Sequence, residues 1–561
     1  MIYTSLLISL FSFSSATGAA TVSPRISLQY ATFQGVNDGN LTKFLGVPFA
    51  QPVSRFEVPK PPTQLLGLQD ATNFGPACPQ QALDPIPAPF PLDNFTISED
   101  CLTLNVFKPT IANSASKLPV FVWFFGGGFE IGDSSNTDVR SVVERSILTE
   151  QPVIIVTPNY RVSAFGFLNS KEMLAAGATN LGIRDQIAAL EWVRRHIGKF
   201  GGDASKVVAG GVSSGAISTG ILMMSNKFNT NILFRGAFLQ SGSPTITGSV
   251  ADGQPGYDDL VAANNCTGSR NTFDCLKDIP FDSFMATVNR TDNIFGFNSL
   301  SGNWRPRADG EVIAQDPMVS VSKGLYSKIP IMTGDSDDEG TIFAFGNKNI
   351  TTNTEFLGYI GSKFLPKSSP EGVALIGSLY PEDPSKGSPF DTGNANVLTP
   401  EFKRLAAFQG DFVFLGPRRF FLEHASTRQN TGSWLNKRGK ANPLVGAFHG
   451  SDQGIWFPQN TTDTVGVDAL INFINTLDPN YSAARGASTH RTDIYWPQWK
   501  TRASSGSTSL STIGDPLSPT SGLTSLLTFS DPEKVDITAE DFRSDAIRSL
   551  NNLVFEAAIA K

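Results

Sequence analysis

The chain has 561 residues, of which 40% are hydrophobic and 17% are charged, so it is long enough to bury the core of one large α/β domain or of two ordinary domains. Its formal net charge is -7, and its Lys and Arg residues form no cluster along the chain. This balance argues against a nucleic-acid partner and against an anionic membrane surface as partner.

The first 20 residues have the pattern of a secretory signal peptide. An apolar run rich in Leu and Phe leads to the small residues Ala16–Ala20, although no Lys or Arg precedes it. We expect residues 1–20 to be removed and residues 21–561 to form a single domain. No other apolar run reaches the length of a membrane span, and the C-terminus lacks the apolar tail of a lipid-anchor signal. A soluble, secreted protein is therefore expected.

Two further patterns agree with export. The chain has seven N-x-[ST] glycosylation sequons, at Asn40, Asn94, Asn265, Asn289, Asn349, Asn460 and Asn480. Its four Cys allow three pairings, of which Cys78 with Cys101 and Cys266 with Cys275 close the short loops that form most easily. A Cys-based metal site is disfavoured because no C-x-x-C spacing or nearby His occurs.

Apolar strands alternate with helices along the chain. We predict strands over 44–50, 104–107, 120–125, 153–157, 206–209, 236–242 and 329–334, helices over 139–149 and 180–197, and a helical excursion over 250–300. The run 120–125 is apolar on both faces, as in a central strand covered by helices. This alternation predicts an α/β fold with a mostly parallel sheet flanked by helices, and a functional site at the carboxyl ends of its strands.

The segment Gly211–Gly215 has the form G-x-S-x-G between an apolar run and a helical pattern. A strand, a tight turn and a helix start would leave the hydroxyl of Ser213 exposed at the apex of a nucleophile elbow. The glycines suit that geometry because side chains there would collide with neighbouring backbone. An ordinary Ser/Gly turn is the alternative, so the rest of the chain has to decide.

A nucleophilic serine needs an imidazole as base and a carboxylate to orient that imidazole. Of the four His, His196 and His424 lie in helical patterns and His490 lies in a polar loop, whereas His449 follows an apolar run, 444–448, that we predict to be a strand. The acid is sought in 334–340, directly after a predicted strand. Its four carboxylates are Asp335, Asp337, Asp338 and Glu339, and a solvated acidic loop or a divalent-ion loop is the alternative. The order serine, acid, histidine is that of α/β-hydrolases.

The glycines Gly126–Gly128 follow the predicted central strand. Backbone N–H groups of Gly127 and Gly128, together with that of Ser214, could stabilise the negative charge that develops on a substrate carbonyl oxygen. A flexible turn and a phosphate-binding loop are the alternatives. No G-K-[ST] or G-x-G-x-x-G pattern follows, which argues against the phosphate loop.

Several ordered motifs carry a resemblance over nearly the whole mature chain. They are EDCLTLNV at 99–106, WFFGGGF at 123–129, NYR at 159–161, NLG at 180–182, FGGD at 200–203, DEGT at 338–341 and GAFH at 446–449. With these motifs the chain resembles the type-B carboxylesterase/lipase family, and within it fungal lipases of the Candida rugosa type. The resemblance implies an α/β-hydrolase fold with Glu339 as the acid, supports both short disulfides, and implies that Ser241 assists Glu339.

The chain departs from the family pattern in two places. The family reads Gly-Glu-Ser-Ala-Gly at the elbow, whereas this chain has Val212 before the serine and Ser214 after it, and Ala209 replaces a larger aliphatic residue. No Trp lies between Cys78 and Cys101, where cholinesterase-like members carry the aromatic ring that binds a quaternary ammonium. A choline ester is therefore not the expected substrate.

The expected function is that of a secreted, glycosylated hydrolase of carboxylic esters. Ser213 forms an acyl-enzyme, His449 transfers the proton and Glu339 orients His449, with no cofactor and no metal. Long-chain acyl or sterol-type esters are the favoured substrates, and short-chain or aromatic (feruloyl-type) esters are the alternative. A non-catalytic binding protein on the same fold is the rival from another class. The sequence makes no prediction of the oligomeric state.

The segment 84–95 corresponds to the mobile flap of the lipases that the chain resembles. Its prolines at 85, 87, 89 and 91 remove backbone donors and disfavour helical conformations in the residues before them. The sequence therefore predicts an extended segment, no helical flap, and an active site that is largely open in solution.

Overall fold

The computed structural model describes residues 23–83, 96–225, 230–459, 463–480, 494–500 and 524–559. The predicted signal peptide, the segment 84–95, the sequons Asn94 and Asn460, and His490 lie outside these residues. No helix among the described ranges combines the length and the apolar character needed to span a membrane.

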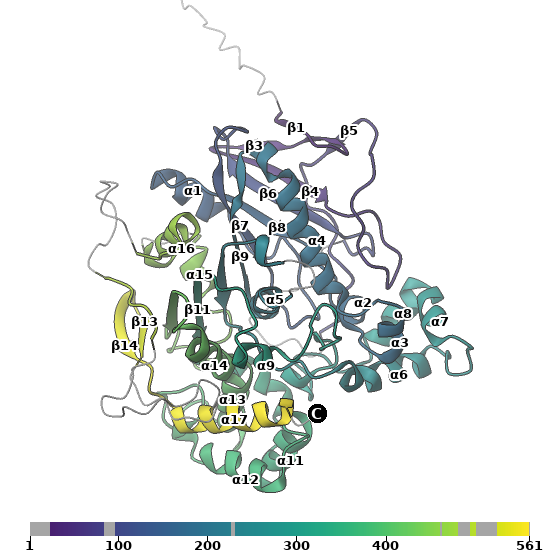
Figure 1. Cartoon of the computed structure of the whole chain (residues 1–561). Helices are drawn as coiled ribbons and strands as arrows, with labels where there is room; N and C mark the ends of the chain where they lie inside the picture. The colour runs from purple at the N-terminus through teal and green to yellow at the C-terminus, as the bar shows by residue number, and fades with distance from the viewer. Residues whose placement is uncertain are drawn as a thin grey trace, which may run out of the picture.

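An 11-stranded sheet runs through the described part of the chain, in the order β14-β13-β12-β11-β10-β9-β7-β8-β6-β4-β3 (Figure 1). Its strands are β3 (Val36–Asp38), β4 (Leu41–Pro48), β6 (Thr103–Pro109), β7 (Leu118–Phe124), β8 (Ile154–Pro158), β9 (Gly202–Val212), β10 (Gly236–Gln240), β11 (Ile331–Ser336), β12 (Thr431–Asn436), β13 (Ser525–Ser530) and β14 (Lys534–Ala539). The strands from β13 to β8 in this order are parallel to one another, and antiparallel pairs occur towards both edges. The predicted mostly parallel sheet is confirmed. A small second sheet holds β1 (Arg25–Ser27), β2 (Thr32–Gln34) and β5 (Leu68–Asp70).

The helices of the described residues connect these strands or extend beyond their ends. They are α1 (Arg140–Leu148), α2 (Ser163–Phe167), α3 (Lys171–Ala175), α4 (Leu181–His196), α5 (Ser214–Leu222), α6 (Gln254–Ala263), α7 (Thr272–Asp278), α8 (Phe281–Val288), α9 (Pro317–Ser322), α10 (Thr341–Ala344), α11 (Asn353–Lys363), α12 (Pro370–Leu379), α13 (Phe402–Gly410), α14 (Gly416–Ala425), α15 (Gln453–Trp456), α16 (Val465–Thr476) and α17 (Ser544–Ile559). A π-helical turn, η8 (Asp411–Leu415), joins α13 to α14.

The sheet is covered on both faces. Along β7, Val120, Val122 and Phe124 pack into the core that contains α4 and α5, whereas Phe121 and Trp123 pack into the core that contains α1 and α16. Figure 1 shows α4 and α5 on one side of the sheet and α1 and α16 on the other. Because successive strand residues point to opposite faces, a strand buried on both sides has to be apolar throughout, as 120–125 is.

Local sequence signals start the helices that gather beyond the sheet at the lower end of Figure 1. At α11 the Thr352 hydroxyl accepts from Glu355 N–H, and the Glu355 carboxylate accepts from Thr352 N–H, which is a complete capping box. At α12 the Ser369 hydroxyl accepts from Gly372 N–H, and Pro370 occupies the first helical position. Both disulfides that close short loops are formed, Cys78–Cys101 and Cys266–Cys275.

The predicted strand over 444–448 is wrong. These residues form a loop, in which Phe448 makes an isolated bridge to Asp338. Gly446 has a φ of 59°, which is incompatible with extended backbone, and Ala447 N–H donates to the carboxylate of Asp338 at 2.8 Å instead of to a strand. His449 is therefore carried by a loop that a side chain anchors, and not by the end of a sheet strand.

Candidate active site

Ser213 lies at the sharp turn between β9 and α5. Its φ is 57° and its ψ is -123°, a region that residues other than glycine rarely occupy. A Cβ at Gly211 would lie 2.5 Å from the carbonyl carbon of Gly215, and a Cβ at Gly215 would lie 2.2 Å from the carbonyl oxygen of Phe124. Both glycines are thus required by the close packing of β7 and α5 around this turn.

Glu339 and His449 are hydrogen-bonded to each other through Oε2 and Nδ1. The second carboxylate oxygen of Glu339, Oε1, accepts from Ser241 Oγ at 2.7 Å and from Ser336 N–H at 2.6 Å. The Glu339 side chain is fully buried. With both oxygens held in this way, the carboxylate has one orientation, and it can fix the tautomer and the direction of the imidazole.

The other three carboxylates of 334–340 have other partners. They pair as Asp335 with Arg418 at 2.6 Å, Asp337 with Lys440 at 2.6 Å and Asp338 with Lys440 at 2.8 Å. Burial raises the pKa of Asp335 to about 7, against the attraction of Arg418. Neither a solvated acidic loop nor an ion-binding loop describes this segment, because its side chains are buried and paired within the protein.

The imidazole of His449 packs against two aromatic rings. Its ring centroid lies 4.5 Å from that of Phe414 and 5.2 Å from that of Phe343, and 10% of its side chain is exposed. No hydrogen bond joins the Ser213 hydroxyl to His449, both of which are described residues. In many hydrolases this bond tightens only when substrate binds.

The glycine loop after β7 lies against the serine. A Cβ at Gly126 would lie 2.9 Å from Ser213 Cβ, and one at Gly128 would lie 2.0 Å from Ile294 Cδ1. Within the described chain, no hydrogen bond uses the backbone N–H groups of Gly127, Gly128 or Ser214. Three unused donors beside a serine are the arrangement that an oxyanion requires.

A pocket opens beside the serine. Gly128, Ser213 and Ser214 line it, and it encloses about 690 Å³ of space including its mouth. Its apolar wall includes Ile217, Ile246, Ile294, Trp304, Phe412 and Phe414. The last two side chains belong to the π-helical turn η8, and such turns are frequent at functional sites. The pocket has the largely apolar lining of a small-molecule site.

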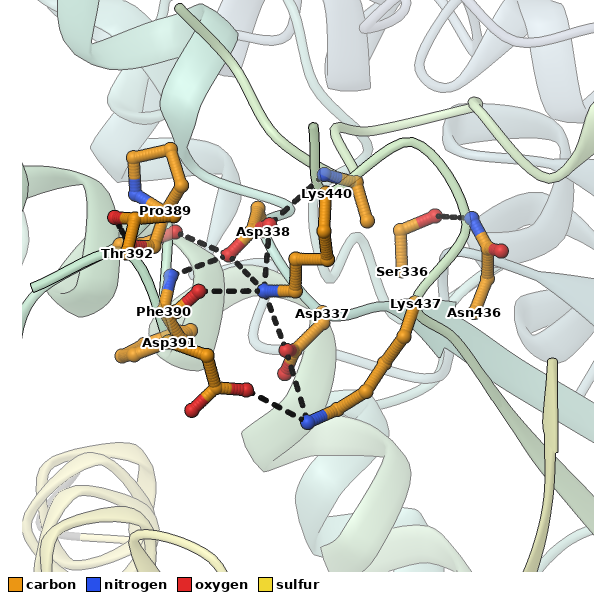
Figure 2. A network of polar contacts seen from close by, with 12 residues as sticks. Ser336, Asp337, Asp338, Pro389, Phe390, Asp391, Thr392, Asn436, Lys437 and Lys440 are labelled. Atoms are coloured by element: carbon orange, nitrogen blue, oxygen red, sulfur yellow. Dashed lines mark hydrogen bonds and ion pairs between the residues drawn. The ribbon is translucent and has the colours of Figure 1, made fainter. Parts of the chain in front are cut away.

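A network of ion pairs anchors the loop that carries His449 (Figure 2). The carboxylate of Asp338 accepts from the backbone N–H of Ala447 and Phe390, both at 2.8 Å, and from the hydroxyl of Ser388 at 3.1 Å. Lys440 Nζ donates to both oxygens of Asp338, at 2.9 and 2.8 Å. Because Asp338 directly precedes Glu339 and Ala447 lies two residues before His449, one carboxylate links the two segments.

The match to known proteins identifies the family. The model of the carboxylesterase family matches residues 22–376. The chain belongs to the carboxylesterase family. A secreted triacylglycerol lipase of Gibberella zeae is 35% identical over 85% of this chain and 84% of that protein. Lipase 4 of Diutina rugosa is 35% identical over 85% of this chain and 89% of that protein.

The solved structures agree on the fold. The crystal structure of Aspergillus niger EstA superposes with a TM-score of 0.78 at 24% identity, over 96% of this chain and 99% of that one. The family resemblance drawn from the motifs is confirmed, and with it the α/β-hydrolase fold. By its family and its relatives, this carboxylesterase is an enzyme that hydrolyses carboxylic esters.

The remaining sequence-predicted residues lie apart from the pocket. His196 packs against the rings of Tyr30 and Trp192, and His424 Nδ1 is hydrogen-bonded to the carbonyl oxygen of Phe420 at 2.8 Å. Both lie in helices, as their sequence patterns indicate. Neither η8 nor the ionisable pocket residues Glu130 and Arg305 could be found from the sequence, because nothing in the local pattern distinguishes them from core or surface positions.

We expect Asp338→Asn to lower kcat on the order of 10- to 100-fold with little change in KM. The amide of the variant cannot accept from the N–H groups of Ala447 and Phe390 and from Lys440 Nζ at the same time. The loop that carries His449 is then no longer held at a fixed distance from Glu339. Steady-state kinetics of the carboxylesterase on a simple ester measure the effect. Asp337→Asn is the matched control because it loses a contact with the same Lys440 but none with the His449 loop. Equal losses in both variants would contradict the positioning role.

We expect Glu130 to make the stability of this carboxylesterase depend on pH. Burial raises the pKa of its carboxyl to about 8, although Ile294 N–H donates to it at 2.7 Å; in an unfolded chain the value is about 4.3. Between these values the folded protein binds more protons than the unfolded chain, so the free energy of unfolding falls as pH rises.

Glu130→Gln removes this contribution and keeps an acceptor for Ile294. We expect the Tm of the variant to fall less than that of the wild type between about pH 5 and about pH 8. Asp335 and Glu423, whose pKa values burial also raises, titrate in both proteins and cancel in the difference. Calorimetry at matched ionic strength measures it, and parallel curves would show that Glu130 is ionised throughout this range.

Proposed function

We propose that this carboxylesterase is a secreted serine hydrolase whose catalytic triad is Ser213, His449 and Glu339. The observation that carries the proposal is the hydrogen bond in which the buried carboxylate of Glu339, held at both oxygens, accepts from His449 Nδ1. It leaves Nε2 of the neutral imidazole as the acceptor for the Ser213 proton. Ser241 acts as a positioning residue through Glu339.

The reaction follows from these positions. Ser213 Oγ attacks the ester carbonyl carbon while His449 takes its proton, and the resulting oxyanion accepts from the N–H groups of Gly127, Gly128 and Ser214. His449 then gives the proton to the leaving alcohol, and an acyl-enzyme remains on Ser213. Water, deprotonated by the same imidazole, releases the carboxylic acid. These steps require neither a metal nor a cofactor.

The apolar pocket wall supports esters with an apolar acyl group, and we favour long-chain acyl or sterol-type esters. Two of the relatives, a secreted triacylglycerol lipase and a lipase, agree with this class. Short-chain or aromatic esters are the second candidate. The polar side chains of Glu130 and Arg305 in the same wall favour them.

Two experiments test the proposal. Labelling with a fluorophosphonate, followed by peptide mass spectrometry, should place the adduct on Ser213 alone. Rates on p-nitrophenyl esters of increasing acyl length should rise towards long chains. A maximum rate at acyl groups of two to four carbons would assign the enzyme to the second candidate class. A fluorophosphonate adduct on another serine would contradict the proposed triad.

We also propose that the protein is secreted and glycosylated, as a single domain over residues 21–561. Both ends of the chain contribute strands to one sheet, β4 near the start and β14 near the end. Asn40, Asn265, Asn289 and Asn349 are exposed sequons. The amide of Asn480 is half-buried and exchanges hydrogen bonds with the backbone of Trp496, so we expect glycans at the four exposed sites and none at Asn480.

The segment 84–95 lies outside the described residues, and its extended form stays a prediction. We expect little interfacial activation, because its prolines disfavour a helical flap that could cover the pocket. The rate on a short-chain triacylglycerol, followed through the solubility limit of the substrate, measures this. A steep rise when droplets form would reveal a lid.

A further inference from the structure

Arg305 is the one cationic side chain among the described residues that line the pocket beside Ser213. It belongs to the segment 299–306, which forms one wall of that pocket together with Ile294 and Phe412. Trp304, next to it, is buried, and its indole N–H donates to Gln81 at 2.9 Å. The wall around the guanidinium is therefore held by packing and by hydrogen bonds, and is not a free surface chain.

The guanidinium has unused donors. Its Nη2 donates to the carbonyl oxygen of Leu300, which is its single hydrogen bond to the described chain. Nε and Nη1 make no hydrogen bond to the described chain, and neither atom is fully buried. These two nitrogen atoms are consequently accessible, although burial of the side chain lowers the pKa of Arg305.

No carboxylate of the described chain forms an ion pair with this guanidinium. Glu130 is the acidic group whose charge acts on it, and that carboxyl is largely protonated at neutral pH because burial raises its pKa to about 8. The neighbouring cation is Arg307, whose pKa falls to about 9 through burial and through the repulsion of Arg305. The pocket wall thus carries the positive charge of Arg305 without a matching negative charge, in surroundings that hydrate it poorly.

A desolvated cation with free donors in an otherwise apolar pocket is costly unless an anion or strong acceptor pairs with it. We propose that Arg305 is an anion subsite of the ester-binding pocket, and that the enzyme prefers esters that carry a free carboxylate next to an apolar body, such as half-esters of dicarboxylic acids. This inference rests on the proposed ester hydrolysis at Ser213. The free carboxylate of such a half-ester would bind Arg305, and its apolar body would contact the apolar wall.

The test compares matched substrates. Monoethyl esters of dicarboxylic acids with four to eight carbons are paired with ethyl esters of the monocarboxylic acids of equal length, and kcat/KM is measured for both. At one chain length we expect the charged ester to be favoured about 10-fold or more, as for other hydrogen bonds to charged groups. In Arg305→Met this ratio should fall by about the same factor, chiefly through KM.

Arg307→Met is the matched control. It removes the same charge two residues away, from a side chain that does not line the pocket, so the ratio should stay within about twofold of the wild type. A wild-type ratio near one at every chain length, or an equal fall in both variants, would overturn the subsite.

Binding separates the subsite from the chemistry. In Ser213→Ala, calorimetric titration with monoethyl adipate and with ethyl hexanoate should show tighter binding of monoethyl adipate, and this preference should vanish when Arg305→Met is added. If neither ester is hydrolysed by the wild type but monoethyl adipate binds in this way, the subsite stands and the proposed function fails. If hydrolysis proceeds without any preference for monoethyl adipate, the proposed function stands and the subsite is wrong.

Discussion

Ser213→Ala and His449→Ala should each abolish ester hydrolysis, with a loss on the order of 10⁴-fold or more in kcat, because the members of a triad act as a unit. The double variant should be no worse than either single one. The fold should persist, since the Ser213 hydroxyl makes no hydrogen bond within the described residues. Active-site titration and steady-state rates on a p-nitrophenyl ester measure the loss, and thermal unfolding shows that the fold is intact.

Ser214→Ala is a useful control for the serine variant. It changes the neighbouring hydroxyl but keeps the backbone N–H that we place at the oxyanion. If Ser213→Ala retained a tenth of the wild-type rate and Ser214→Ala were inactive, the assignment of Ser213 as the nucleophile would be wrong.

Glu339→Gln should lower kcat by about 10³- to 10⁴-fold, with substrate binding little changed. The amide can present its NH₂ group to His449 Nδ1 and so stabilise the tautomer that has the proton on Nε2, which cannot accept from Ser213. It also leaves the imidazolium formed in the transition state without a negative partner. Rates at saturating substrate, with KM from the same curves, measure the effect.

Asp337→Asn is the appropriate comparison for this variant. It removes a carboxylate two residues away whose partner is Lys440 and not His449. Asp335→Asn is less suitable, because it leaves the fully buried Arg418 with one carboxylate fewer and should destabilise the fold by about 3 kcal/mol or more. If Glu339→Gln kept its activity while Asp337→Asn lost it, the acid would have been assigned wrongly.

Much of the fold could be predicted from local pattern. The strand over 120–125 is apolar at every position, and the helix over 180–197 has apolar residues at helical spacing, so each showed its burial directly. The structure places β7 at Leu118–Phe124 and α4 at Leu181–His196. The loop that carries His449 was predicted wrongly because its apolar run imitates a strand, whereas its backbone bonds to a distant side chain, Asp338.

The sequence by itself determined the nucleophile turn, the candidate base and the family. A G-x-S-x-G turn and a glycine loop are local requirements of backbone geometry, and they are visible wherever they occur in a chain. Four carboxylates in one short segment could not be separated in that way, because their roles depend on partners that lie 83 to 110 residues further along the chain. Only the tertiary structure directs Asp335 to Arg418, Asp337 and Asp338 to Lys440, and Glu339 to His449. The same holds for Arg305, an unremarkable residue in the sequence, which the fold places in an apolar pocket beside Ser213 with donors that the described chain does not use.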